Sequence, residues 1–253
     1  MKQNISVVIN TYNAEKFLAQ TLDRLGAFDE IVVCDMESTD STRDIAARYG
    51  CKIVSFPKAS HKSAEPARTF AIQSAASDWV LVVDADELVS PELHDYLYDF
   101  IKNPGDVRGL YIPRQNLTMR VALPASYPDY QLRFFIKEGT EWPPYVHTFP
   151  TVKGKLAHIP RQRRELAFLH LDDNTRADMN RMNNYTDNEV EKRPLKHVTL
   201  AKMIFSPMMR FLKMYFLKRG FLYGKAGYVQ AMRHSMYKFT VLCKMYEKEI
   251  GID

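Results

Sequence analysis

The stretch Trp79-Val80-Leu81-Val82-Val83-Asp84-Ala85-Asp86-Glu87 joins an apolar run directly to three carboxylates. The run at residues 79–83 carries no charge, which is typical of a strand buried on both faces of a sheet. Because residues i and i+2 of an extended chain point to the same side, we predict that Asp84 and Asp86 point together beyond the strand. Two neighbouring carboxylates repel each other unless a cation lies between them, and Mg²⁺ and Mn²⁺ prefer oxygen ligands. Taken alone, the same residues also fit a solvated loop.

Three further apolar segments precede this stretch, and helical patterns alternate with them. Repeated strand–helix alternation predicts an α/β fold whose mostly parallel sheet has right-handed crossovers and flanking helices. Ligands of such sheets bind beyond the carboxyl ends of the strands. The predicted strands are residues 5–9, 30–34, 52–56 and 79–83, and the predicted helices are residues 14–25, 41–50, 66–76 and 90–103.

Polar segments follow two of the other strands, at residues 10–15 and 35–40. Asp35 is placed to accept hydrogen bonds from a base or from ribose hydroxyls, whereas a helix-capping loop is the alternative for Ser38 and Ser41. Three polar loops at the ends of parallel strands would converge on one crevice. Their convergence favours a nucleotide site more strongly than any single loop does.

The rest of the chain changes character twice. Residues 109–171 are rich in Pro, Tyr and β-branched side chains, and we predict strands at residues 109–114, 131–137, 151–158 and 167–171, joined by long loops. From about residue 176 the pattern is helical. We therefore predict one domain at residues 1–175 and a helical extension at residues 176–253.

The charge is distributed unevenly. The net charge is +5, yet residues 192–246 contain 12 Lys or Arg and no Asp or Glu, which leaves the rest of the chain net acidic. Met and aromatic side chains recur at helical spacing among these cations, at Phe205, Met208, Met209, Leu212, Tyr215 and Phe216. This pattern predicts that residues 195–246 contact an anionic membrane surface. Packing of the same stripe against the protein core, or a mixture of the two, remains an alternative.

Several classes of protein lose their usual signatures. The chain has no G-x-G-x-x-G, Walker A, H-E-x-x-H or G-x-S-x-G motif, which disfavours dinucleotide oxidoreductases, P-loop NTPases, zincins and α/β-hydrolases. Three widely spaced cysteines predict a reducing compartment and no structural zinc. We expect neither a membrane span nor a signal peptide.

Three motifs together resemble the family-2 glycosyltransferases with the GT-A fold. They are residues 7–13 (VVINTYN), 30–40 (EIVVCDMESTD) and 78–87 (DWVLVVDADE), and their order and spacing match over roughly the first 100 residues. A looser match at residues 127–135 (YPDYQLRFF), at Val146-His147 and from Lys218 onward resembles bacterial lipopolysaccharide-core glucosyltransferases.

The resemblance implies a GT-A-type, Rossmann-like sheet with a helical C-terminal extension. It also implies inverting transfer of a sugar from a nucleotide-sugar, with a UDP-sugar as the expected donor, to a hydroxyl of a cell-envelope glycan or glycolipid. The cofactor would be Mn²⁺ or Mg²⁺, and the location would be cytoplasmic, at the inner face of the bacterial inner membrane. In the residues that match the family, Thr11, Glu15, Asp35 and Arg68 would contact the donor, Asp84 would contact donor and metal, and Asp86 would bind the metal.

An inverting transfer also needs a general base that takes the proton of the acceptor hydroxyl. Asp129 is the first candidate and His147 the second. An Asx-turn is the alternative for Asp129, and a hydrogen-bonded structural role is the alternative for His147 and the preferred interpretation of His170. Arg133 would pair with either a phosphate or a buried carboxylate.

Two other functions remain as alternatives at this stage. A nucleotide-sugar pyrophosphorylase would also use a nucleotide-binding α/β sheet and metal carboxylates. It usually has a Gly-rich loop with basic residues after its first strand, and this chain has none. A nucleic-acid-binding protein would use the basic segment at residues 195–246. The Met and Leu content of that segment fits lipid or a protein core better, so we expect no nucleic-acid partner.

Overall fold

The computed structural model describes residues 4–59, 61, 64–144, 148–171, 174–194 and 197–252. The chain folds into two units. The first contains residues 1–115 and 128–170, and the second contains residues 116–127 and 171–253. The short segment at residues 116–127 thus belongs with the C-terminal helices.

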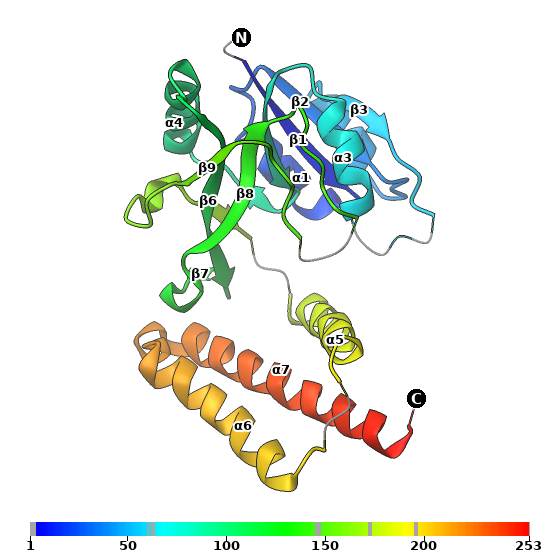
Figure 1. The fold of residues 1–253 in the computed structure, drawn as a ribbon, viewed down its shortest axis with the longest axis vertical. Coiled ribbons are helices and arrows are strands. Elements are labelled where there is room, and N and C mark those ends of the chain that lie inside the picture. The colour runs from blue at the N-terminus through cyan, green and yellow to red at the C-terminus, as the bar shows by residue number, and fades with distance from the viewer. Residues whose placement is uncertain are drawn as a thin grey trace. The chain divides into compact units, whose positions relative to one another are not determined.

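The first half of the first unit is a parallel sheet. Strands β3 (Lys52–Ser55), β2 (Glu30–Asp35), β1 (Ile5–Thr11) and β4 (Trp79–Asp84) lie side by side in this order (Figure 1). The connecting helices are α1 (Glu15–Leu22), α2 (Thr42–Arg48) and α3 (Glu65–Gln73), and α4 (Pro91–Lys102) follows β4. The predicted α/β alternation is confirmed here.

Antiparallel strands extend this sheet beyond β4. Strand β8 (Asp129–Ile136) pairs antiparallel with β4, and β6 (Val107–Thr118) pairs antiparallel with β8. Because β8 runs against β4, its first residue lies near the carboxyl end of β4. The remaining strands are β5 (Glu87–Leu88), β7 (Val121–Ala122), β9 (Lys155–His158) and β10 (Phe168–His170), and single 3₁₀ turns occupy Pro124–Ser126 and Arg164–Leu166.

The strand predicted at residues 151–158 is shorter than expected. It begins at Lys155, directly after Gly154, whose φ of +117° is a conformation that L side chains rarely adopt. Thr151 instead forms an isolated antiparallel bridge with Glu141.

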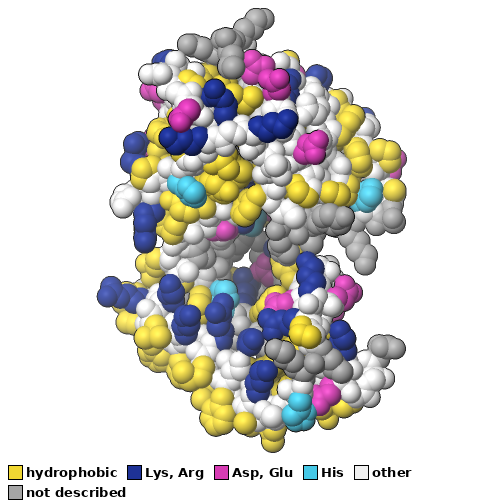
Figure 2. Space-filling view, viewed as in Figure 1, with side chains coloured by type: hydrophobic (Ala, Val, Ile, Leu, Met, Phe, Trp, Pro, Cys, Tyr) yellow, Lys and Arg dark blue, Asp and Glu magenta, His cyan; other side chains and the backbone are white. Residues whose placement is uncertain are grey.

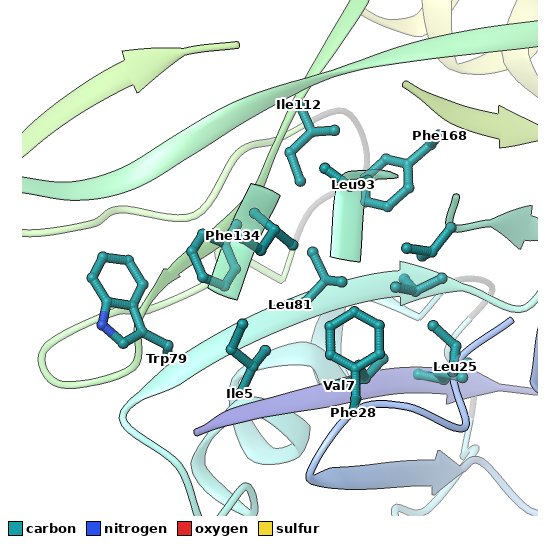
Figure 3. Close-up of a cluster of buried hydrophobic side chains, with 14 of the residues drawn as sticks. Ile5, Val7, Leu25, Phe28, Trp79, Leu81, Leu93, Ile112, Phe134 and Phe168 are labelled. Atoms are coloured by element: carbon teal, nitrogen blue, oxygen red, sulfur yellow. The ribbon is translucent and has the colours of Figure 1, made fainter. Parts of the chain in front are cut away.

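Helices cover both faces of the parallel sheet. On one face, Ile5, Val7 and Leu81 pack with side chains of α1 and α4, and Phe134 of β8 stacks on Trp79 with ring centroids 4.9 Å apart (Figure 3). On the other face, alternate residues of the same strands pack against Ala67, Ala71 and Ile72 of α3. Burial on both sides explains why residues 7–9 of β1 and residues 79–83 of β4 are apolar.

Apart from residues 116–127, the second unit is helical. It contains α5 (Thr175–Glu191), α6 (Leu200–Leu212), a π-helical segment η3 (Lys213–Leu217), a 3₁₀ segment η4 (Gly220–Tyr223) and α7 (Gly224–Ile250). The side chains of Asn174 and Thr199 cap α5 and α6. A small core of Val190, Val198, Val241, Leu242 and Met245 joins these helices. Within the described ranges, no helix is both long and apolar enough to span a bilayer.

Candidate active site

Asp84, the last residue of β4, lies between two buried arginines. Arg68 of α3 donates to its Oδ1 at 2.9 Å, and Arg133 of β8 donates to its Oδ2 at 2.5 Å. Burial alone would raise the pKa of Asp84, but the charges and hydrogen bonds of Arg133 and Arg68 hold the pKa well below its ordinary value. The indole ring of Trp142 covers both guanidinium groups. Its centroid lies 4.5 Å from the central guanidinium carbon of Arg68 and 5.5 Å from that of Arg133.

Several buried polar atoms around Asp84 have no partner among the described residues. They are Nε and Nη1 of Arg68, Nε of Arg133, Nε1 of Trp142 and both amide atoms of Asn10. Asn10 lies beside Asp84 in the register of β1 and β4. Buried donors without acceptors are rare and costly in folded proteins. Four of these six atoms are donors on cationic or aromatic side chains, which suits an anionic, oxygen-rich ligand.

Asp86 has a different partner from Asp84. The strand ends at Asp84 and residues 85–86 form a turn, so the alternation that predicted the two carboxylates to point together does not continue past Asp84. Nε2 of His170 lies 3.4 Å from Oδ2 of Asp86. Burial lowers the pKa of His170, but the hydrogen bond and charge of Asp86 outweigh it, so the net pKa is raised.

The contact between His170 and Asp86 was not predicted from the sequence, in which a structural role was the preferred interpretation of His170. The signal that places it here is the pairing of β10 with β5, in which His170 is the partner of Glu87. A carboxylate beside an imidazole is a ligand combination that divalent metals accept. No group of three or more His, Cys, Asp or Glu in the described part of the chain is arranged to hold a metal ion, so a cation at Asp86 would also need oxygen ligands from a substrate or from water.

Asp129 is tied to the same edge through an arginine. Nε and Nη2 of Arg114 donate to Oδ2 of Asp129 at 2.9 Å and 2.7 Å, while Nη1 of Arg114 lies 3.0 Å from Oε1 of the fully buried Glu87. Gln131 donates to the other oxygen, Oδ1, at 2.9 Å. The guanidinium group of Arg114 therefore bridges Asp129 and Glu87, the residue that follows Asp86. The second predicted base, His147, lies outside the described residues.

Thr11 and Asp35 come together at the ends of β1 and β2. Oγ1 of Thr11 donates to Oδ1 of Asp35 at 3.1 Å, and the buried Asp35 also accepts hydrogen bonds from Ser38 and Arg43. Glu15, in the first turn of α1, is exposed and accepts from the backbone N–H of Ser41 at 3.0 Å. The structure thus gathers Thr11, Asp35, Arg68, Asp84, Asp86 and Asp129 along the carboxyl edge of the sheet. Glu15 bridges two loops there.

Comparison with known proteins places this arrangement in a family. Residues 6–156 match the family model described as "Glycosyl transferase family 2". The lipopolysaccharide core biosynthesis glycosyltransferase LpsC of Rhizobium meliloti (strain 1021) is 24% identical over 261 residues, which cover 98% of this chain and 93% of LpsC. An uncharacterized glycosyltransferase of Rickettsia typhi is 25% identical over 265 residues, covering 97% of this chain and 87% of that protein.

A solved structure supports the fold. The mannosyltransferase PcManGT from Pyrobaculum calidifontis, solved in complex with GDP-Man and Mn²⁺, matches with a TM-score of 0.56 at 14% identity, covering 97% of this chain and 87% of that one. At this identity the match concerns the fold alone, and it confirms the GT-A architecture. With more than half of its residues inside the matched family model, the chain belongs to glycosyl transferase family 2.

Proposed function

We propose that the protein is an inverting, metal-dependent glycosyltransferase that moves a sugar from a nucleotide-sugar to a hydroxyl of a cell-envelope glycan or glycolipid. The observation that carries this proposal is the set of buried, unpartnered N–H groups of Arg68 and Arg133 beside Asp84. The phosphate oxygens of a donor would supply the acceptors that these groups lack. Membership of the family favours transfer over the pyrophosphorylase alternative.

The donor would lie along the carboxyl edge of the sheet. Thr11, Asp35 and Glu15 would contact its base and ribose, and a UDP-sugar is the donor that we expect. Asp84 would act mainly by holding Arg68 and Arg133 in place, since both of its oxygens already accept hydrogen bonds from them. The two arginines would then bind the diphosphate.

Mn²⁺ or Mg²⁺ would be held by Asp86, with His170 beside it and Asp84 close in sequence. The donor set fits such an ion because the Asp86 carboxylate is 29% exposed and has an imidazole within 3.4 Å. When bound, the ion would offset the negative charge that develops on the departing diphosphate.

Asp129 is our first candidate for the general base, and His147 is the second. Nε and Nη2 of Arg114 hold the Asp129 carboxylate through two hydrogen bonds. They also fix its orientation at the start of β8, near the carboxyl end of β4. An acceptor hydroxyl bound there would give its proton to this carboxylate as it attacks the sugar.

The acceptor is proposed to be lipopolysaccharide core or a similar envelope glycan. The similarity to LpsC over nearly the whole chain supports this choice. The cationic, apolar surface of the second unit supports attachment to an anionic membrane, from the cytoplasmic side of the inner membrane.

A thermal-shift experiment tests the metal and donor assignments together. UDP-, GDP-, ADP- and CMP-sugars are added with and without Mn²⁺, and a ligand present at 100 times its Kd is expected to stabilise the protein by about 2.7 kcal/mol. Asp86→Ala should lose the Mn²⁺-dependent part of the shift, whereas Asp44→Ala, an exposed carboxylate on α2, should keep it. An unchanged Mn²⁺-dependent shift in Asp86→Ala would overturn the metal assignment, and absence of any donor-induced shift in the wild type would overturn the donor site.

A further inference from the structure

A cavity of about 760 Å³ lies in the second unit, well separated in sequence from the active-site residues. Its walls come from α6, η3 and α7, with one residue of α5. Its polar side carries Arg210, Lys213 and Lys238, and its apolar side carries Met209, Phe216 and Leu217. The cavity thus combines a cluster of cations with an aliphatic and aromatic wall.

Among the described residues, none of the three cations is close enough to a carboxylate to form an ion pair, although the charge of Glu189 acts on Lys238. The one carboxylate in the wall, Glu189, is already engaged, because it pairs with Arg193 and accepts a hydrogen bond from the Tyr237 hydroxyl at 2.5 Å. Burial lowers the pKa of Lys238, and the charge of Arg193 lowers it further. The charge of Glu189 raises this pKa, but the net shift is downward. Like charges held this close favour an anion between them, since an anion relieves their mutual repulsion.

The apolar wall continues onto an exposed surface. Leu217 is 79% exposed, Met209 58% and Phe216 55%, which is unusual for side chains of this size. They belong to a stripe at helical spacing along α6 and η3, formed by Leu200, Ile204, Phe205, Met208, Met209, Leu212, Phe216 and Leu217. Figure 2 shows the Lys and Arg side chains of this unit gathered next to hydrophobic side chains at its edge.

We propose that this cavity binds the phosphate group of an anionic lipid, while the acyl chains of that lipid lie along the apolar stripe. The proposal deepens the membrane association proposed above and rests on it. The cations complement a phosphate, and the contiguous apolar stripe fits acyl chains better than it fits a free phosphate or a nucleic acid. Membrane binding would then include one saturable headgroup site as well as diffuse electrostatic attraction.

The test uses the full chain and dihexanoyl phosphatidic acid below its critical micelle concentration, measured by isothermal titration calorimetry. We expect saturable 1:1 binding, with affinity at least about tenfold weaker for glycerol 3-phosphate, which lacks acyl chains, and for dihexanoyl phosphatidylcholine, which lacks net charge. Lys238→Gln should weaken phosphatidic acid binding about tenfold. Lys225→Gln removes the same charge from an exposed position of α7 outside the cavity and should change it less than about twofold.

Arg210→Gln provides a second, exposed variant in case Lys238→Gln fails to fold, as judged by its melting temperature. Equal losses in the Lys238 and Lys225 variants, or equal affinity for glycerol 3-phosphate and phosphatidic acid, would overturn the lipid site. Tighter binding of a single-stranded RNA than of phosphatidic acid would also overturn it. Sedimentation with phosphatidylglycerol vesicles separates the two proposals: if the wild-type protein sediments but shows no saturable binding of the short-chain lipid, membrane association stands and the cavity proposal falls.

Discussion

Asp84 and Asp86 have different side-chain partners and different structural roles, although only one residue separates them. Asp84 is the counter-charge of two arginines whose side chains are 8% and 5% exposed, whereas the partner of Asp86 is a half-buried histidine. Removal of the Asp84 carboxylate would leave two buried cations without a counter-charge. An uncompensated buried charge is strongly destabilising. Asp86 is therefore free to serve a ligand in a way that Asp84 is not.

The difference predicts unequal stabilities for two matched variants. Asp84→Asn should lower the free energy of unfolding by about 2 kcal/mol or more, a value below that of a fully buried pair because the carboxylate itself is partly exposed. Asp86→Asn should cost less than about 1 kcal/mol. Urea denaturation monitored by circular dichroism measures both, and equal losses would show that Asp84 does not hold the arginines.

Asp129 provides a second prediction at this scale. If Asp129 is the base, Asp129→Asn should reduce turnover by about 10²-fold or more, because an amide cannot accept the proton of the acceptor. The thermal shift with donor and Mn²⁺ should remain, since Asp129 lies outside the proposed donor contacts. Gln131→Ala is a useful control, because it removes the donor to Oδ1 while keeping the carboxylate at Asp129. Near-normal turnover of Asp129→Asn would move the role to His147 or elsewhere.

At the scale of elements, local pattern predicted some parts of the site and could not predict others. β1, β2 and β4 end in polar residues after unbroken apolar runs, so their shared edge followed from the sequence. The turn at residues 85–86 did not follow, because alternation holds only while the chain remains extended. Trp142 and His170 reach the site through loop packing and through the pairing of β10 with β5, and such long-range pairings leave no periodic signal near either residue.

The hairpin of helices in the second unit depends on a contact between two glycines. A Cβ on Gly227 of α7 would lie 1.9 Å from the backbone oxygen of Gly220 in η4, so α7 and η4 approach at backbone distance. Gly227→Ala would gain about 1 kcal/mol of helix propensity but would force the two backbones apart. We expect a net loss of about 1–3 kcal/mol of unfolding free energy, as for other overpacked sites.

Gly26→Ala is the matched control, because a Cβ on Gly26 meets no atom within 4 Å. Its melting temperature should remain within about 2 °C of the wild type, in keeping with the small effects of most surface substitutions. If Gly227→Ala were as stable as Gly26→Ala, η4 would have to adjust without cost, and the close approach would not be needed for the packing of the second unit.

At the scale of the whole molecule, the charge distribution separates the candidate active site from the surface that we propose to contact a membrane. The acidic groups of the candidate active site belong to the first unit, while the acid-free segment at residues 192–246 belongs to the second. Family membership and the similarity to LpsC leave open how the chain would reach the envelope acceptor that we propose. The basic, apolar second unit offers a physical answer, because each basic residue near an anionic leaflet contributes about 1 kcal/mol.

Vesicle binding should therefore depend on both salt and the exposed apolar stripe. The fraction of protein that sediments with phosphatidylglycerol vesicles should fall as the salt concentration rises from 0.1 M to 1 M, because the screening length shrinks from about 10 Å to about 3 Å. Leu217→Ser should weaken binding about tenfold at constant salt, since burial of a leucine side chain contributes about 1.5–3 kcal/mol. Ile252→Ser, which removes a side chain that is 58% exposed but lies outside the stripe, should leave it unchanged. Salt-independent sedimentation, or equal weakening by the two variants, would mean that this surface does not face a membrane.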